Sequence, residues 1–111
     1  MSRRDPIVRL RHMLDHAQEA VDLLGEMSEQ QLRDDRVIQL ALTRLIEIVG
    51  EAAGAVPNDV RDQYSHLPWR EAVGMRNVLA HGYDIIEYAI IWDTVRNSLP
   101  PLIAQLRQIL D

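Results

Sequence analysis

The residues best equipped for chemistry lie in one short stretch, 76–83, which reads Arg-Asn-Val-Leu-Ala-His-Gly-Tyr. It contains a permanent cation in Arg76, a histidine in His81 and a phenol in Tyr83. The forked guanidinium of arginine matches the oxygens of a phosphate, and histidine is the side chain most able to move protons at neutral pH. A site that binds or cuts a phosphodiester needs both. The stretch therefore indicates phosphate chemistry, although a structural role, with Arg76 in an ion pair and His81 at a helix end, fits these residue types equally well.

The charge balance restricts how a phosphate could be held. All twelve positively charged residues are arginines, and the formal net charge is −5. A general nucleic-acid coat protein would be basic, so this chain does not fit that class. A phosphate partner must be held by a local arginine cluster or at a site shared between subunits, for which the forked donors of arginine are suited.

Length and composition indicate one helical domain over residues 1–111. The chain has no cysteine, which excludes disulfides and thiolate metal sites and fits a reducing cytoplasm. No apolar run follows the N-terminus, so we expect neither a secretion signal nor a membrane span. We expect no metal and no cofactor.

Apolar residues recur at helical spacing, which predicts an all-α, four-helix up-and-down bundle. The expected helices cover about 5–25, 34–56, 68–80 and 84–110. Asp5 and Pro6 form the first N-terminus and Gly25 its end, and Ser28 with Gln31 makes a capping box. A short extra helical turn is expected at 58–63, in the connection before the third helix.

The second helix is apolar on nearly all sides, which predicts a central position and favours burial in a dimer. Gly50 and Gly54 leave a flat strip on it, where another backbone could come close. The last helix contains Pro100-Pro101, which are expected to kink it.

The spacing of Arg76 and His81 decides whether both side chains can contact one phosphate. In an unbroken helix, residues five apart are separated by ~140° and do not share a face. Gly82 is expected to end the third helix, so that His81 falls in or just past its final turn and can swing toward Arg76. Cations are favoured there by the helix dipole. Tyr83 is expected just outside the helix with its hydroxyl in solvent.

The pattern Arg-x4-His-x-Tyr at 76–83 resembles that of the HEPN superfamily, and specifically its HepT-like toxin branch. Three further segments resemble the same family: RLIEIVGEA at 44–52, LPW at 67–69 and IWDTV at 91–95. The resemblance spans about residues 5–107.

The resemblance implies a metal-independent endoribonuclease toxin, active as a homodimer or higher oligomer and paired with a minimal nucleotidyltransferase antitoxin. Arg76 and His81 would be catalytic in a composite cleft, with Asn77 in support, and AMPylation of Tyr83 would neutralise the toxin. Two alternatives stay open: a non-catalytic HEPN dimer that only binds a nucleotidyltransferase, and a nucleotide-binding module that uses Arg76 without cleavage.

Other charged or aromatic residues give weaker signals. Arg44, Glu47 and Glu51 lie about one turn apart on an apolar helix, which predicts buried ion pairing among them or with Arg76, in a structural rather than catalytic role. His12, His16 and Glu19 have metal-like spacing but lie on what looks like a solvated face. His66 is expected at the surface, and Trp69 and Trp92 in core packing rather than stacked on a base.

Overall fold

The computed structural model describes residues 5–77 and 87–111, and every regular element in these ranges is helical. The order is α1 (Pro6–Leu24), α2 (Glu29–Arg33), α3 (Arg36–Gly54), α4 (Asn58–Gln63), α5 (Trp69–Gly74), the 3₁₀ turn η1 (Met75–Asn77), α6 (Tyr88–Asp93), the π-helical turn η2 (Thr94–Ser98) and α7 (Leu99–Leu110). The all-α prediction is confirmed, and the short turn expected at 58–63 is α4.

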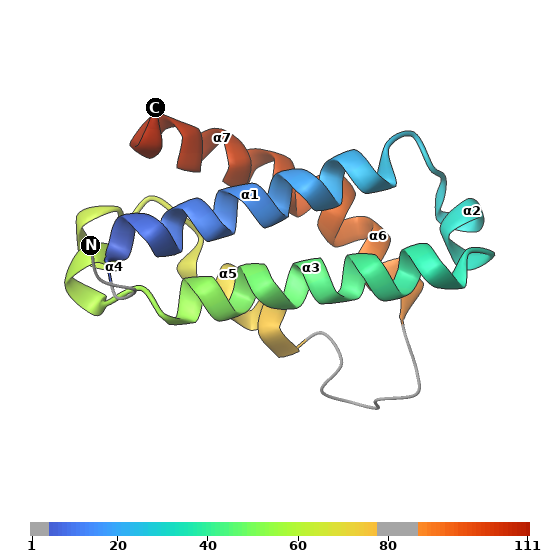
Figure 1. Ribbon diagram of the computed structural model, residues 1–111, viewed down its shortest axis with the longest axis horizontal. Coiled ribbons are helices and arrows are strands. Elements are labelled where there is room, and N and C mark those ends of the chain that lie inside the picture. The colour runs from blue at the N-terminus through green and yellow to red at the C-terminus, as the bar shows by residue number, and fades with distance from the viewer. Residues whose placement is uncertain (1–4, 78–86) are drawn as a thin grey trace.

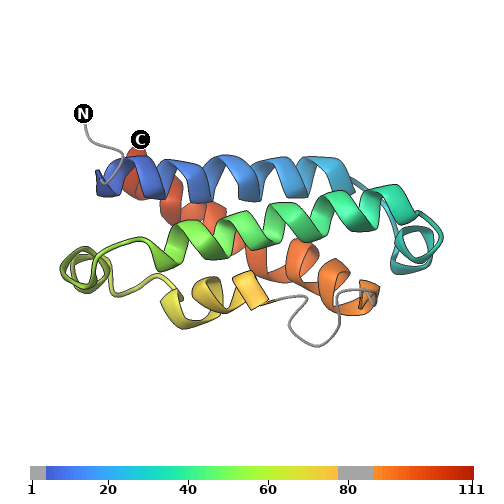
Figure 2. The ribbon, with the colours of Figure 1, turned by 60° about the horizontal axis from the view of Figure 1, so that its bottom comes forward.

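The two long helices, α1 and α3, run antiparallel side by side along the length of the molecule (Figures 1 and 2). The helix α7 packs against α1, while α5 and η1 pack against α3. Apolar side chains from α1, α3 and α7 fill the core and are less than a tenth exposed: Leu10, Met13, Leu14, Leu42, Ile46, Val49, Leu99, Leu102 and Leu106. Every one lies on a helical stripe facing its neighbours, which is how an amphipathic helix contributes to a core.

Local caps fix where the first helices begin and end. The Asp5 carboxylate accepts a hydrogen bond from the Ile7 amide at 2.9 Å, and Gly25 ends α1 with a φ of 54°. The predicted capping box is present, because Ser28 Oγ accepts from the Gln31 amide at 3.1 Å and Gln31 Oε1 accepts from the Ser28 amide at 2.8 Å. These side chains satisfy amide groups that a helix N-terminus leaves unpaired.

The C-terminal helical segment adapts to its two prolines through a π-helical turn. Pro100 and Pro101 have no N–H to give to the carbonyls of Arg96 and Asn97, four residues earlier. The turn η2 lies just before them, and the Leu99 amide donates to the Thr94 carbonyl, five residues back, as in a π-helix. At these prolines, for which the sequence predicts a kink, the chain therefore changes its hydrogen bonding and the helical segment continues as α7.

The third helix differs from the prediction. The sequence predicts one helix over 68–80, whereas the α-helical part, α5, ends at Gly74 and continues as the 3₁₀ turn η1. The tighter geometry of a 3₁₀ turn is common at the end of an α-helix, where the last carbonyls lack partners. Arg76 and Asn77 thus lie in a tight turn rather than on a regular helical face.

None of the helices in the described ranges is long and apolar enough to cross a membrane.

Candidate functional site

The turn η1 carries Arg76 and Asn77, the first two residues of the stretch singled out by its chemistry. Both side chains are exposed. In Figure 2 the turn lies beneath the C-terminal half of α3, at the end of the short helix α5. Val78, Leu79, Ala80, His81, Gly82 and Tyr83 lie outside the residues that the structure describes, so the predicted roles of His81 and Tyr83 stay predictions.

Gly50 on α3 allows the backbone of Arg76 to lie in direct contact with that helix. A Cβ added at Gly50 would lie 2.8 Å from both the Arg76 Cα and the Met75 carbonyl carbon, and closer still to the Arg76 amide nitrogen. Real Cβ atoms essentially never approach a backbone so closely, so only glycine fits at position 50 without displacement of η1. The flat strip predicted on this helix is confirmed.

The second glycine of the strip lies against the side chain of Arg76. A Cβ added at Gly54 would lie 3.0 Å from Nη1 of Arg76, so the guanidinium extends along α3 toward its C-terminal end. The negative end of a helix dipole favours a cation there.

The guanidinium of Arg76 has no carboxylate within salt-bridge distance among the described residues. The one ion pair found in 5–77 and 87–111 joins Arg44 and Glu51. The interpretation of Arg76 as half of an ion pair therefore finds no support within these ranges. Such a guanidinium, exposed and held against a glycine strip, can bind an incoming phosphate.

The charged residues of α3 are not buried, which corrects the sequence prediction. Arg44 Nη1 lies 3.1 Å from Glu51 Oε1, so the predicted pairing is present, but the two side chains are 60% and 56% exposed. The helix directs them to solvent because the apolar side chains that contact α1 take the opposite face. Glu47 is half-buried. An exposed pair of this kind contributes about 0–1 kcal/mol to stability.

Arg61, on α4, is a residue that the sequence reasoning missed. Its Nε donates to the Val56 carbonyl at 3.0 Å, and its Nη2 donates to the carbonyls of Ala53 and Gly54 at 3.2 and 3.1 Å. Its guanidinium also stacks over Trp69, 5.9 Å from the ring centroid. An arginine a few residues past a helix end is a known way to satisfy the last carbonyls, and this was the signal available in the sequence.

The two tryptophans contribute to packing, as predicted. Both are partly buried against the core, and their indole N–H groups donate to carbonyls, Trp69 to Tyr64 at 3.0 Å and Trp92 to Met27 at 3.0 Å. Arg96 donates to the same Met27 carbonyl at 2.9 Å and stacks over Trp92. These bonds attach α6 and η2 to the turn between α1 and α2.

The remaining histidines of the described ranges show no catalytic grouping. His16 Nδ1 lies 2.7 Å from the His12 carbonyl, and His66 is exposed in the loop before α5. No group of three or more His, Cys, Asp or Glu side chains placed to hold a metal occurs in the part of the chain that the structure describes.

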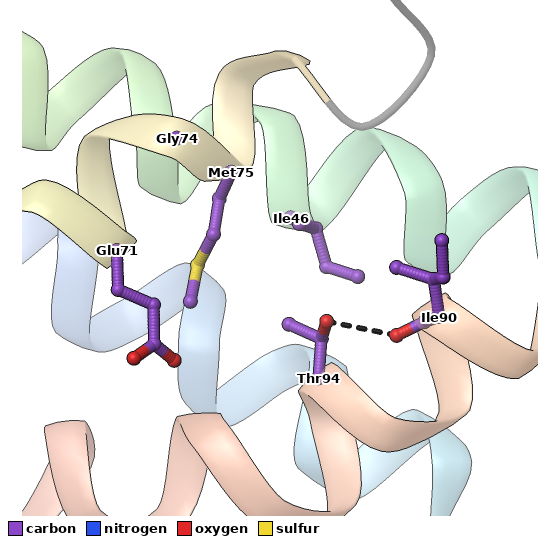
Figure 3. Close-up of a pocket in the computed structure, with 6 residues that line it drawn as sticks. All are labelled: Ile46, Glu71, Gly74, Met75, Ile90 and Thr94. Atoms are coloured by element: carbon purple, nitrogen blue, oxygen red, sulfur yellow. Dashed lines mark hydrogen bonds between the residues drawn. The ribbon is translucent and has the colours of Figure 1, made fainter. Parts of the chain in front are cut away.

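A cavity of about 200 Å³ lies between α3, α5 and the segment α6–η2 (Figure 3). It is lined by Ile46, Glu71, Gly74, Met75, Ile90 and Thr94, and Thr94 Oγ1 already donates to the Ile90 carbonyl at 2.8 Å. Its walls are mostly apolar and its one charged side chain is a carboxylate. A phosphate would be repelled there, so the exposed guanidinium of Arg76 is the better anion site.

Comparison with known proteins places the chain among ribonuclease-like relatives. A family profile described as "Ribonuclease HepT-like" matches residues 13–109. A provisionally named RNase of Methanocaldococcus jannaschii is 32% identical over 92% of this chain and 94% of its own length. Another, from Caldanaerobacter subterraneus, is 34% identical over 96% of each chain. A protein of Thermococcus cleftensis, provisionally named ribonuclease HepT, is 33% identical over 80% of this chain and 84% of its own length. No solved structure matches the chain at a significant level.

Proposed function

The chain belongs to the HepT-like family of the HEPN superfamily, and on this premise we propose that it is a metal-independent endoribonuclease whose catalytic residues are Arg76 and His81. The proposal is supported chiefly by the position and contacts of Arg76. Its backbone is pressed against Gly50, its guanidinium lies over Gly54, and no described carboxylate neutralises it. A guanidinium held in this way can make charge-assisted hydrogen bonds to a phosphate.

The proposed reaction is attack of a ribose 2′-hydroxyl on the adjacent phosphorus. His81 takes the proton from this hydroxyl as general base or gives one to the leaving 5′-oxygen as general acid. The bond from the 2′-oxygen to phosphorus forms as the bond to the 5′-oxygen breaks, which leaves a 2′,3′-cyclic phosphate and a 5′-hydroxyl. Arg76 stabilises the charge that builds on the non-bridging oxygens. Asn77, exposed beside it, supports the site by orienting His81 or a phosphate oxygen.

A homodimer would complete the site. The chain is acidic overall, so two copies of Arg76 and His81 in one groove would concentrate positive charge where RNA must bind. The outer face of α3 supports such an assembly, because Val37 is 73% exposed and Leu40 is 48% exposed. Large apolar side chains exposed on one helix face favour a protein contact.

A partner protein would regulate the ribonuclease activity. We propose that the protein is the toxin of a two-component module and that a minimal nucleotidyltransferase antitoxin attaches AMP to Tyr83. Adding a nucleotide with a negative phosphate two residues from His81 would crowd the cleft and repel RNA, by the same physics as phosphorylation.

The alternatives are a non-catalytic HEPN dimer that serves as nucleotidyltransferase partner, and a nucleotide-binding module. One experiment separates the three. Purified protein is incubated with labelled RNA in EDTA, next to Arg76→Ala and His81→Ala variants. Cleavage by the wild type alone supports the nuclease. An inert wild type that binds a nucleotidyltransferase favours the partner role, and one that binds nucleotides without cleaving RNA favours the binding module.

The modification has its own test. Mass spectrometry after co-expression with a nucleotidyltransferase should show added AMP on Tyr83. A neutralised toxin with an unmodified Tyr83 would show that inhibition works through contact alone.

A further inference from the structure

Two guanidinium groups meet at a single glycine near the end of α3. The Gly54 carbonyl accepts a hydrogen bond from Arg61 Nη2 at 3.1 Å, while Nη1 of Arg76 lies 3.0 Å from the position that a Cβ of Gly54 would occupy. Arg61 comes from α4 and Arg76 from η1, so the two approach the end of α3 from different elements.

The end of α3 attracts any nearby cation. The last carbonyls of a helix have no partner within the helix, and together they carry a partial negative charge. An arginine that reaches them makes charge-assisted hydrogen bonds, which are stronger than neutral ones. The guanidinium of Arg76 reaches Gly54, the last residue of α3, so carbonyls left free at this end would compete with a substrate phosphate for it.

Arg61 already occupies two of these carbonyls. Its Nη2 donates to the carbonyls of Ala53 and Gly54 at 3.2 and 3.1 Å, and its Nε donates to that of Val56, two residues past the end of α3, at 3.0 Å. Arg61 is half-buried and Arg76 is exposed, so one arginine is committed to the scaffold while the other faces solvent.

We propose that Arg61 is a positioning residue that keeps Arg76 available for RNA. By satisfying the terminal carbonyls of α3, it prevents Arg76 from binding them, so the Arg76 guanidinium meets the phosphate without first leaving the helix. This inference rests on the proposed ribonuclease function. The second contact of Arg61 has a related role. Its guanidinium stacks on Trp69, the first residue of α5, and so helps to hold the helix that leads into η1.

The matching variant is Arg61→Gln, and the chain offers a closely matched control in Arg96→Gln. Arg96 also combines a carbonyl bond, to Met27 at 2.9 Å, with a stack on a tryptophan, 5.4 Å from the Trp92 centroid. It does so near α2, at the opposite end of the molecule from α4 (Figure 1). Both variants lose the same kinds of contact, and Arg61→Gln, which loses three carbonyl bonds against one, should lose the more stability.

The kinetic result should separate the two variants. If Arg76 is captured by the vacated carbonyls, only the uncaptured fraction binds RNA, and the apparent KM rises by the inverse of that fraction. Capture in nine molecules of ten would raise KM about tenfold and leave kcat within about twofold. Arg61→Lys, which keeps the charge and part of the donor set, should give an intermediate KM. Arg96→Gln should leave KM unchanged.

A second readout does not depend on cleavage. NMR of the arginine side chains should show slow exchange of the Arg76 guanidinium protons in Arg61→Gln but not in the wild type or in Arg96→Gln. Slow exchange in a protein that cleaves no RNA would support the positioning role while the ribonuclease proposal fails. Unchanged Arg76 exchange, or a KM that rises equally in Arg96→Gln, would overturn the inference. Should Arg61→Gln not fold, the same two measurements on Arg61→Lys decide.

Discussion

Replacing Gly50 with alanine tests how tightly η1 is pressed against α3. The new Cβ would lie 2.8 Å from the Arg76 Cα and from the Met75 carbonyl carbon. These atoms belong to the backbone, so no flexible side chain can yield and η1 must move. Overpacking of this kind costs about 1–3 kcal/mol, while replacing a mid-helix glycine with alanine returns roughly 0.8–1 kcal/mol. Because nothing at the contact can bend away, we expect a net loss of about 1–2 kcal/mol.

The loss is measurable by urea and thermal unfolding. For a domain of this size it corresponds to a fall in Tm of roughly 4–12 °C. Gly74→Ala is the matched control, because a Cβ added there meets nothing within 4 Å. Its stability should stay unchanged or rise by up to about 1 kcal/mol. The reasoning is refuted if Gly50→Ala proves as stable as Gly74→Ala, since that would mean η1 does not rest on the glycine strip.

The other predictions concern the side chains around this strip and the proposed switch. Gly54→Ala should cut RNA cleavage several-fold with no loss of Tm, because its Cβ would push the flexible guanidinium of Arg76 and not the backbone; an unchanged kcat/KM would contradict this. Glu51→Gln removes an exposed ion pair with Arg44, so the free energy of unfolding should change by less than about 1 kcal/mol and the rate of RNA cleavage should not change. A large change in either quantity would mean that the pair does more than hold two solvated side chains together. Tyr83→Phe should cleave RNA normally in vitro, but co-expression of the nucleotidyltransferase should no longer restore the growth of cells that produce it. Full restoration of growth would show that modification of the Tyr83 hydroxyl is not what neutralises the toxin.

Local signals explain why the ends of the first helices could be predicted. Asp5, Ser28 and Gln31 act on amides two or three residues away, and Gly25 adopts a positive φ that other residues avoid. Such features depend on neighbours in sequence, so pattern alone is sufficient to place them.

Features that depend on distant parts of the chain were only partly predictable. The spacing of Gly50 and Gly54 indicated a close backbone contact but could not say that the partner was the turn carrying Arg76. The end of α5 at Gly74 was missed because the apolar period continues past it into the 3₁₀ turn, the geometry that the last turn of an α-helix often takes. Arg61 was missed because its position past a helix end allows a bond to the last carbonyls, but only the path of the chain from α3 to α4 brings the side chain back to them.

The burial of charges on α3 was predicted wrongly for a related reason. An almost wholly apolar helix reads as enclosed on every side, and its charges then need buried partners. In the structure one face of α3 stays open, with Val37 and Leu40 exposed on the same face as Arg44 and Glu51. A helix that is enclosed within one chain and a helix that a second copy covers have the same apolar pattern in the sequence.

The chemical ends left on cleaved RNA test the central claim most directly. Wild-type protein in EDTA should produce 2′,3′-cyclic phosphate and 5′-hydroxyl ends, and should fail on an RNA whose scissile nucleotide carries a 2′-deoxyribose. Arg76→Ala and His81→Ala should both lose the activity. Cleavage of the deoxy-substituted RNA, or equal cleavage by Arg76→Ala, would contradict a reaction in which the 2′-hydroxyl attacks and Arg76 stabilises the phosphate.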